Sequence, residues 1–159
     1  MVISKDQKTK LIDNAANYSD FLRNLLISNN ELKNILEIHI DKPFNSSELQ
    51  KNLTRKKVNS IQTLNSALRQ TRQLFYALGI VRDVNGMASL EEIFDLNCSL
   101  AETFLHYAHD FYLKELTKVY GSPQDEKGKT SNLIIVGMGK LGGYELNSSS
   151  DIDIIFLYD

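Results

Sequence analysis

The chain has 159 residues, of which 42% are hydrophobic, which is enough for one compact domain or for one domain and part of another. The formal net charge of −2 and the lack of a long apolar run give no general reason to expect nucleic acid or a membrane as a partner. The single cysteine, Cys98, cannot form an internal disulfide, and the first residues lack a signal-peptide pattern, so a reducing, cytoplasmic location is expected.

Residues 1–120 show hydrophobic spacing close to the period of a helix. Ser47 with Gln50, and Ser89 with Glu92, match the capping box, so a helix is predicted to begin at each serine. Asn30 is a candidate cap for a shorter helix. The region is predicted to be a bundle of four or five helices, with a break at 83–86. Its helical apolar positions are Phe21, Leu22, Leu25, Leu26, Leu32, Ile35, Leu36, Leu64, Leu68, Phe75, Leu78, Ile93, Leu96, Leu100, Phe104, Tyr107 and Phe111.

The pattern changes after residue 120. Residues 121–131 include Pro123 and Gly128 and no large apolar side chain, which predicts a linker. Two short apolar runs follow, at 133–136 and 152–158, and their β-branched and aromatic residues are typical of strands buried on both faces. The expected fold class is α+β, with a helical region at 1–120, a linker at 121–131 and the start of a second domain at 132–159.

A glycine-rich loop and a pair of aspartates lie between the two predicted strands. The loop reads Gly137-Met-Gly-Lys-Leu-Gly-Gly143, and the pair is Asp151 and Asp153. Alternate residues of a strand point to the same face, about 6.6 Å apart, so these carboxylates could share a pair of divalent cations. Nucleotidyl transfer uses such an arrangement. Glycines let backbone amides approach phosphates, and Lys140 or Ser150 could add donors.

Three other interpretations of this segment compete with a metal site. The loop matches the dinucleotide fingerprint G-x-G-x-x-G, but residues 144–150 are too few for a parallel crossover. A Walker loop is disfavoured because Leu141 follows Lys140, leaving no hydroxyl for magnesium. The third interpretation is a glycine turn beside two solvated aspartates with no function. It stays open, but it requires that the strand, the loop and the Asp-x-Asp pair occur together by chance.

The run Gly137-Met-Gly-Lys-Leu-Gly-Gly-Tyr-Glu-Leu-Asn-Ser-Ser-Ser-Asp-Ile-Asp-Ile-Ile-Phe156 resembles the signature of the glutamine synthetase adenylyltransferases. These enzymes are members of the DNA polymerase beta-like nucleotidyltransferase superfamily. Shorter matches occur upstream, in the order of that family's leading helical region. They are Leu68-Arg69, Arg72, Val81-Arg82-Asp83, Leu100-Ala-Glu102 and Tyr120-Gly121.

The resemblance implies the activity, the cofactor and the partners. The segment is similar to the family's amino-terminal domain, which removes AMP from a glutamine synthetase tyrosine by Mg²⁺-dependent phosphorolysis, whereas a carboxy-terminal domain attaches AMP from ATP. Glutamine synthetase, PII signal protein, ATP or ADP, and phosphate are the implied partners and ligands.

The resemblance also implies the roles of single residues. Asp151 and Asp153 would be catalytic and bind the metal, and Gly142 and Gly143 would line the phosphates. Gly139 and Lys140 fit the superfamily's usual spacing before the aspartates better, so which pair is equivalent stays open.

The superfamily uses a third carboxylate on a later strand. Asp159 lies about 20 Å along the predicted strand from Asp153, too far to join one metal cluster. The chain is therefore expected to be an amino-terminal fragment that lacks activity by itself and exposes apolar strand faces. A non-catalytic helical interaction module, or a decayed gene product, is the alternative.

Weaker signals favour ordinary structural roles. His106 and His109 share a helix face but have no further ligand at metal spacing. Cys98 is expected to be a small core residue. A solvated helix face is favoured over an acidic or phosphate-bearing partner for the basic residues between Leu49 and Arg82. These are Lys51, Arg55, Lys56, Lys57, Arg69, Arg72 and Arg82.

Overall fold

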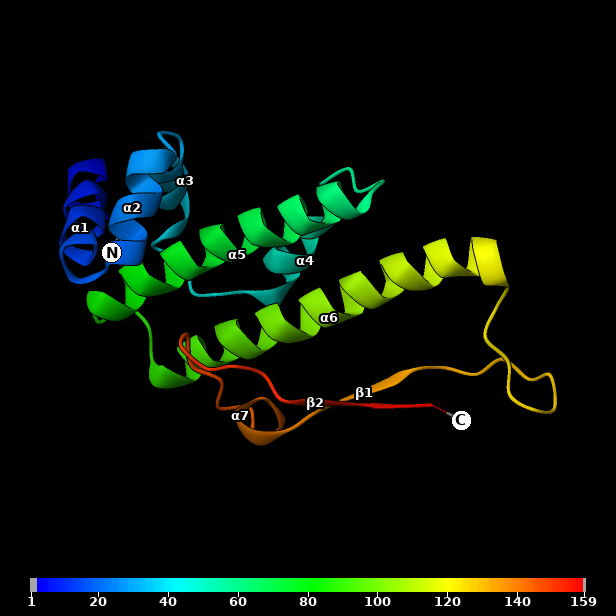
Figure 1. Ribbon diagram of the computed structural model, residues 1–159. Coiled ribbons are helices and arrows are strands. Elements are labelled where there is room, and N and C mark those ends of the chain that lie inside the picture. Colours follow the sequence, from blue (N-terminus) through cyan, green and yellow to red (C-terminus); the bar gives the residue numbers. More distant parts are fainter. Residues whose placement is uncertain (1–2, 159) are drawn as a thin grey trace. The chain divides into compact units, whose positions relative to one another are not determined.

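The computed structural model describes residues 3–158 and is mostly helical, with a small antiparallel sheet (Figure 1). This architecture confirms the α+β class. The elements are α1 (Lys5–Tyr18), α2 (Asp20–Ser28), α3 (Leu32–His39), α4 (Ser46–Thr54), α5 (Ile61–Val84), α6 (Leu90–Tyr120), β1 (Ile134–Gly137), α7 (Gly139–Gly142) and β2 (Ile154–Leu157).

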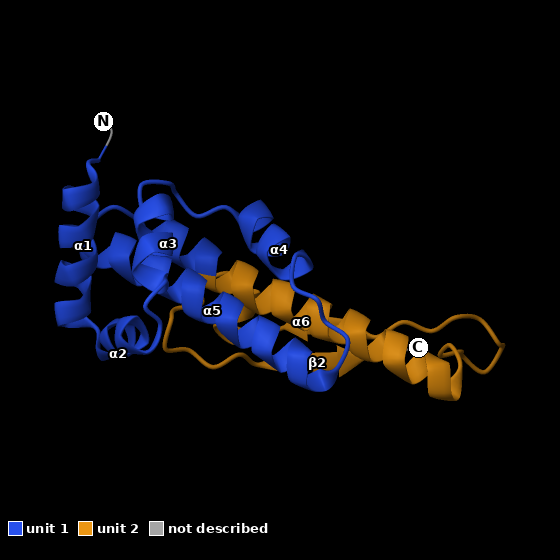
Figure 2. Cartoon of the chain, turned by 90° about the horizontal axis from the view of Figure 1, so that it is seen from above, with its two compact units in different colours: residues 1–96 blue, residues 97–159 orange. Residues whose placement is uncertain are grey.

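The chain divides into two compact units, residues 1–96 and residues 97–159 (Figure 2). The division falls inside α6, whereas the sequence places domain limits at 120 and 131, and those limits stay predictions. No helix within residues 3–158 is long and apolar enough to cross a membrane.

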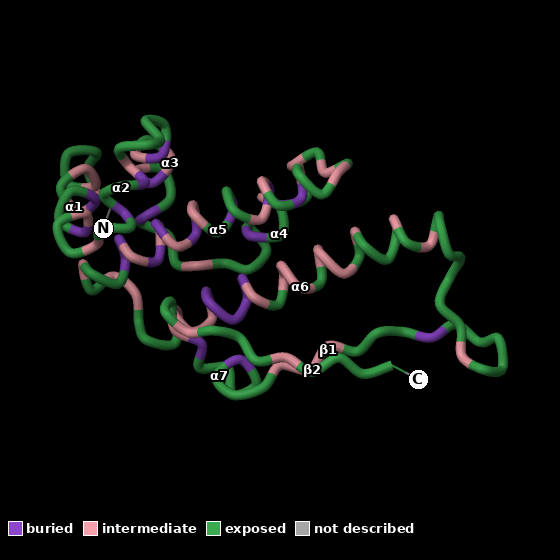
Figure 3. Tube along the Cα trace, in the orientation of Figure 1, coloured by how far each residue is buried: buried purple, intermediate pink, exposed green. Residues whose placement is uncertain are grey.

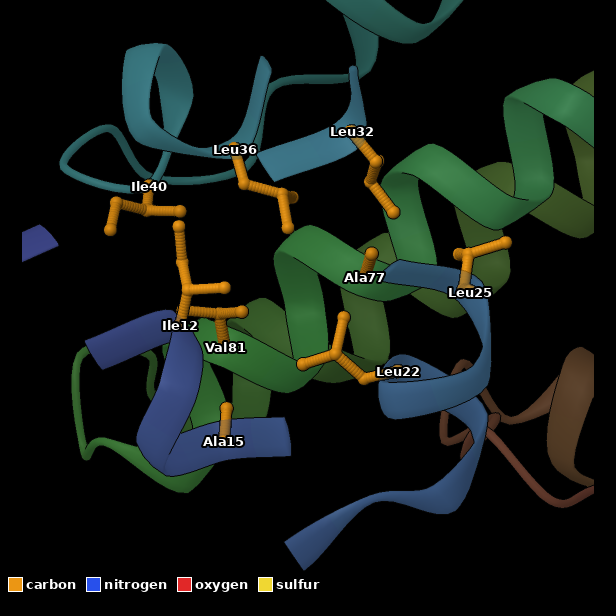
Figure 4. Close-up of a cluster of buried hydrophobic side chains, with 9 residues drawn as sticks. All are labelled: Ile12, Ala15, Leu22, Leu25, Leu32, Leu36, Ile40, Ala77 and Val81. Atoms are coloured by element: carbon orange, nitrogen blue, oxygen red, sulfur yellow. The ribbon is translucent and has the colours of Figure 1, made fainter. Parts of the chain in front are cut away.

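The core of the first unit lies where α1, α2 and α3 pack against the last turns of α5 (Figure 4). Helix α4 packs separately on α5 through Leu49 and Leu53, which are fully buried. The side chains of the main cluster are Ile12, Ala15, Leu22, Leu25, Leu32, Leu36, Ile40, Ala77 and Val81. Four of these nine positions, Leu22, Leu25, Leu32 and Leu36, were predicted from helical spacing.

Helix α1 lies in the predicted helical region, but no separate helix was predicted at its residues, although they begin with a capping box. Ser4 Oγ accepts a hydrogen bond from Gln7 N at 3.3 Å, and Ser4 N donates to Gln7 Oε1 at 2.9 Å. Only Ile12 and Ala15 of this helix are fully enclosed by the core, so its apolar stripe is too thin to be recognised by periodicity. The capping box was the signal available in the sequence.

Two of the predicted caps are wrong by one or two residues. Helix α4 begins after Asn45, not Ser47, because the Asn45 side chain accepts a hydrogen bond from Ser47 N at 2.9 Å. Near α3, Asn29 rather than Asn30 supplies the side-chain acceptor, for Glu31 N at 3.1 Å. An asparagine side chain is short enough to accept a hydrogen bond from the amide two residues ahead. The capping residue therefore lies earlier in the chain than predicted in both cases.

Ser89 accepts a hydrogen bond from Glu92 N at 3.2 Å, as predicted for the start of α6. The Glu92 carboxylate does not complete the capping box, however, because it binds Arg82. Arg82 is 6% exposed, so the prediction that it belongs to a solvated basic face is wrong. The break at 83–86 is confirmed, since α5 ends at Val84.

The second unit contains most of α6, a turn and the hairpin β1–β2. Residues 121–131, predicted to be a linker, contain a turn in which Asp125 Oδ1 accepts from Lys127 N at 2.9 Å and from Lys129 N at 2.8 Å. The residues of both strands are intermediate or exposed (Figure 3), so the prediction of strands buried on both faces is wrong. Ile134 is 56% exposed and Phe156 is 54% exposed. Each strand pairs on one edge only within the described residues, and α6 covers little of their surface.

Candidate functional site

The hairpin holds the two ends of the glycine-rich segment together. The register pairs Ile134 with Leu157 and Gly137 with Ile154, and Met138 N then donates to Asp153 O at 2.8 Å. The antiparallel pairing confirms that the loop is not a dinucleotide cradle, which would require a parallel crossover. Asp153 is thereby fixed opposite the start of the loop.

Strand β2 begins at Ile154, so Asp151 and Asp153 precede the strand and do not lie within it. The prediction of a strand from Ile152 is wrong at this end. The reason lies in the partner strand: beyond Met138 the backbone turns away at Gly139, whose φ is +53°, and no strand remains for residue 151 or 152 to pair with. The expectation that Asp151 and Asp153 point to the same face of a strand, about 6.6 Å apart, therefore does not apply to this pair.

Gly139 brings the loop into contact with the Asp153 carboxylate. A Cβ atom at Gly139 would lie 3.3 Å from Asp153 Oδ2, and its positive φ is a conformation that residues with side chains rarely adopt. The Asp153 carboxylate therefore lies next to the Gly139 backbone, and no side chain at residue 139 separates them. A phosphate group could approach both.

Gly142 has a different geometry. A Cβ atom there would lie 2.6 Å from Gly137 O, and Gly142 N donates to Met138 O at 3.0 Å. Gly143 N likewise donates to Gly139 O at 2.9 Å. These two amides complete the short helix α7, so Gly142 and Gly143 let the turn close tightly, and their own N–H groups already have acceptors.

Lys140 and Ser150, the two predicted extra donors, are brought together. Lys140 Nζ donates to Ser150 Oγ at 3.3 Å, and Ser150 Oγ donates to Asn147 Oδ1 at 2.7 Å. Asn147 Oδ1 also accepts a hydrogen bond from Ser149 N at 3.2 Å, and the backbone oxygen of Asn147 accepts one from Ser150 N at 3.1 Å. The run Asn147-Ser-Ser-Ser150 is typical of a turn, but Asn147 was not among the predicted site residues.

The loop is anchored by two leucines that the sequence analysis did not single out. Leu141 and Leu146 are 6% and 4% exposed and pack with Cys98 of α6. Ala101, Leu105 and Ile154 surround this cluster. Cys98 is thus a core residue, as predicted, and the two leucines hold both sides of the glycine turn on the helix.

The donor chemistry at the aspartate pair fits a hard divalent cation. Asp151 and Asp153 are exposed carboxylates, and no ion pair within residues 3–158 neutralises either one. The described residues contain no group of three His, Cys, Asp or Glu side chains placed to hold a metal. Asp159, considered as a third carboxylate, lies outside the described residues. The aspartate pair therefore supplies two carboxylates, the kind of ligand that hard divalent cations prefer.

The weaker candidates have ordinary partners. His106 Nδ1 lies 2.9 Å from Glu102 O, and His109 Nδ1 lies 3.2 Å from Asp110 Oδ1. Among the basic residues, Lys51 pairs with Glu48 at 2.9 Å.

Comparison with known proteins supports the resemblance. A family model described as glutamate-ammonia ligase adenylyltransferase matches residues 9–159. A bifunctional glutamine synthetase adenylyltransferase/adenylyl-removing enzyme of Aromatoleum aromaticum is 33% identical over 158 residues, covering 99% of this chain and 17% of the relative. The enzymes of the same name from Chromobacterium violaceum and Shewanella woodyi are 36% and 40% identical, over 92% and 84% of this chain and 16% and 13% of their own lengths.

The chain thus spans less than a fifth of the length of these curated relatives. The match nevertheless extends over nearly all of this chain, including the helical region and the glycine loop. This chain belongs to the glutamate-ammonia ligase adenylyltransferase family, whose members are nucleotidyltransferases.

Proposed function

We propose that the loop 137–153 is the nucleotide-phosphate and magnesium site of an adenylyl-removing nucleotidyltransferase domain. The observation that carries the proposal is the approach of Asp153 Oδ2 to the bare Cα of Gly139, in a loop that also joins Lys140 to Ser150. A carboxylate, an exposed backbone and a cation on one turn are the groups that a metal-bound phosphate requires.

Each residue has a proposed part. Asp151 and Asp153 would hold Mg²⁺, which when bound neutralises phosphate charge and polarises the phosphorus–oxygen bond. Lys140 would donate to a phosphate oxygen, and Ser150, oriented by Asn147, would keep the lysine over the loop. Gly139 would leave room for the Asp153 carboxylate beside the loop, while Gly142 and Gly143 would keep the turn tight.

The substrate and partners are proposed from the family. The relatives' name describes enzymes that act on glutamine synthetase, and we assign this chain to the half that removes AMP by phosphorolysis, producing ADP, because its loop carries Met138 and the run Asn147-Ser-Ser-Ser-Asp151. The transfer breaks the bond between the tyrosine oxygen and the adenylyl phosphorus, forms a bond from phosphate oxygen to that phosphorus, and returns a proton to the tyrosine. PII signal protein as a regulator, and a cytoplasmic location, belong to the same proposal.

A chimaera tests the assignment. Residues 9–158 of this chain would replace the matching segment of the Chromobacterium violaceum relative, and ADP release from adenylylated glutamine synthetase would be measured with phosphate and Mg²⁺. We expect release that is lost in Asp153→Ala, while adenylyl transfer from ATP is retained. A chimaera that retains adenylyl transfer but releases no ADP would contradict the assignment.

The chain by itself is proposed to be inactive, because its described residues supply two carboxylates to the metal site. Purified chain mixed with adenylylated glutamine synthetase, phosphate and Mg²⁺ should release no ADP. Release that Asp153→Ala abolishes would overturn this part of the proposal.

A further inference from the structure

We propose that a cavity within residues 1–96 binds a small amphiphilic carboxylate, with an aromatic or aliphatic body and one anionic end. The cavity has a volume of about 620 Å³ and is lined by the segment between α3 and α4, by α4, by α5 and by the first residues of α6. Ligand pockets in proteins commonly have volumes of about 300–1,000 Å³. The inference does not depend on the proposed function of the glycine loop.

The floor of the cavity is apolar. Phe44 and Phe75 meet edge to face, with ring centroids 6.0 Å apart, and Leu78 and Ile93 extend the surface. At Gly79 a Cβ atom would lie 2.5 Å from Leu96 Cδ2, so the missing side chain lets Leu96 close the floor against α5. Such a surface favours the burial of a ring or a short alkyl chain.

The lining also carries a small excess of positive charge. Three basic side chains line the cavity (Lys42, Arg55 and Arg82), together with two carboxylates (Glu48 and Glu92). Arg82 and Glu92 neutralise each other at 2.7 Å, and Glu48 is paired with Lys51 at 2.9 Å. Within residues 3–158, Lys42 and Arg55 form no ion pair and remain available for a ligand anion.

A further donor lies on the wall. Asn52 Oδ1 accepts a hydrogen bond from Thr71 Oγ1 at 2.9 Å, and this bond leaves the Asn52 amide group free to donate toward the cavity. A monoanionic carboxylate gives up less hydration than a dianionic phosphate when it enters a cavity lined largely by apolar side chains. The combination of an apolar floor, an amide donor and two unpaired cations therefore favours a carboxylate.

Titration of the full 159-residue chain with 4-phenylbutyrate tests the proposal, followed by the backbone amide NMR signals. We expect saturable shifts at Asn52, Leu78 and Ile93, and little response to the neutral 4-phenylbutanol or to phenyl phosphate. Arg55→Gln should weaken binding roughly tenfold, because a hydrogen bond to a charged group is lost. Lys57→Gln, an exposed neighbour that does not line the cavity, should bind like the unchanged chain.

Three results would overturn the proposal. They are equal affinity for the neutral alcohol, tighter binding of phenyl phosphate, and shifts confined to the exposed strand residues Ile155 and Phe156. Unchanged binding by Arg55→Gln, in a variant with the same melting temperature as the unchanged chain, would do so as well.

Discussion

The Glu92 carboxylate accepts hydrogen bonds from Arg82 Nε at 2.7 Å and from Arg82 Nη2 at 3.0 Å. The same guanidinium donates to Ile40 O and to Met87 O, each at 2.8 Å, and Glu92 Oε1 accepts from Phe44 N at 2.9 Å. One ion pair thereby joins the end of α3, the segment before α4, the turn after α5 and the start of α6.

Removing one partner of this pair should be costly. Arg82→Met leaves the Glu92 carboxylate partly buried without its cation, and we expect the free energy of unfolding to fall by about 3 kcal/mol, measured by urea denaturation. Lys51→Met is the matched control, because its pair with Glu48 is exposed, at 58% and 56% against 7% and 17% for Arg82 and Glu92. The control should lose less than about 1 kcal/mol. Equal losses would contradict the structural role of Arg82.

Acid should weaken the same contact. Burial raises the pKa of the Glu92 carboxyl, but the hydrogen bonds from Arg82 and the Phe44 amide outweigh it, and the pKa lies below its ordinary value of 4.5. A carboxyl with a lowered pKa stabilises the folded chain above its unfolded-state pKa, and this stabilisation is lost as the pH falls through the folded-state value. The free energy of unfolding should therefore decline from about pH 5 downward.

The Glu92→Gln variant measures how much of the acid dependence of the unfolding free energy comes from the Glu92 carboxyl. The Lys8 hydrogen bond lowers the pKa of Asp41, and the Lys51 hydrogen bond lowers that of Glu48, so some acid dependence remains in the variant. The difference in unfolding free energy between the unchanged chain and Glu92→Gln should narrow between pH 7 and pH 3. A constant difference would refute the assignment of acid dependence to Glu92.

Gly139→Ala should disturb the aspartate site as well as the backbone. The new Cβ would be strained at a φ of +53° and would press on Asp153 Oδ2. Gly128→Ala is the control, since its φ is +77° and nothing lies within 4 Å of the added atom. Each substitution should destabilise the chain by about 1–2 kcal/mol, but only Gly139→Ala should weaken Mn²⁺ binding. A loss of binding in both variants would show that strain alone is responsible.

Leu146 should determine how firmly the loop is held. Leu146→Ala removes a side chain that is 4% exposed from the cluster around Cys98, and we expect a loss of about 2–4 kcal/mol together with faster amide hydrogen exchange at residues 137–147. Leu157→Ala makes the same chemical change at a position that is 50% exposed and should have a small effect. If both variants exchange alike, the anchoring role of Leu146 is wrong.

The helices were largely predictable because each buries one regular stripe of side chains, as at Leu22 and Leu25 or Leu32 and Leu36. Helix α1 lacked such a stripe, and the caps depend on which of two nearby polar residues completes a turn, Asn45 rather than Ser47 and Asn29 rather than Asn30. The burial of Arg82 depends on Glu92, ten residues ahead and on another helix, so local charge pattern could not reveal it.

The composition of the candidate site was readable from the sequence, but its geometry was not. The glycines, Lys140, Ser150 and the aspartates were all recognised from residue type and spacing. That Asp153 precedes the strand and lies against Gly139 follows from where the hairpin register ends, at Gly137 and Ile154. The register is set by pairing between strands, which spacing along one strand does not specify.

The most direct test of the proposed site uses Mn²⁺ in place of Mg²⁺ and follows paramagnetic broadening of the backbone amide signals. The account predicts broadening centred on Gly139 and residues 150–153, abolished by Asp153→Asn and unchanged by Asp110→Asn, whose carboxylate is exposed on α6. Broadening centred elsewhere, or undiminished in Asp153→Asn, would contradict it.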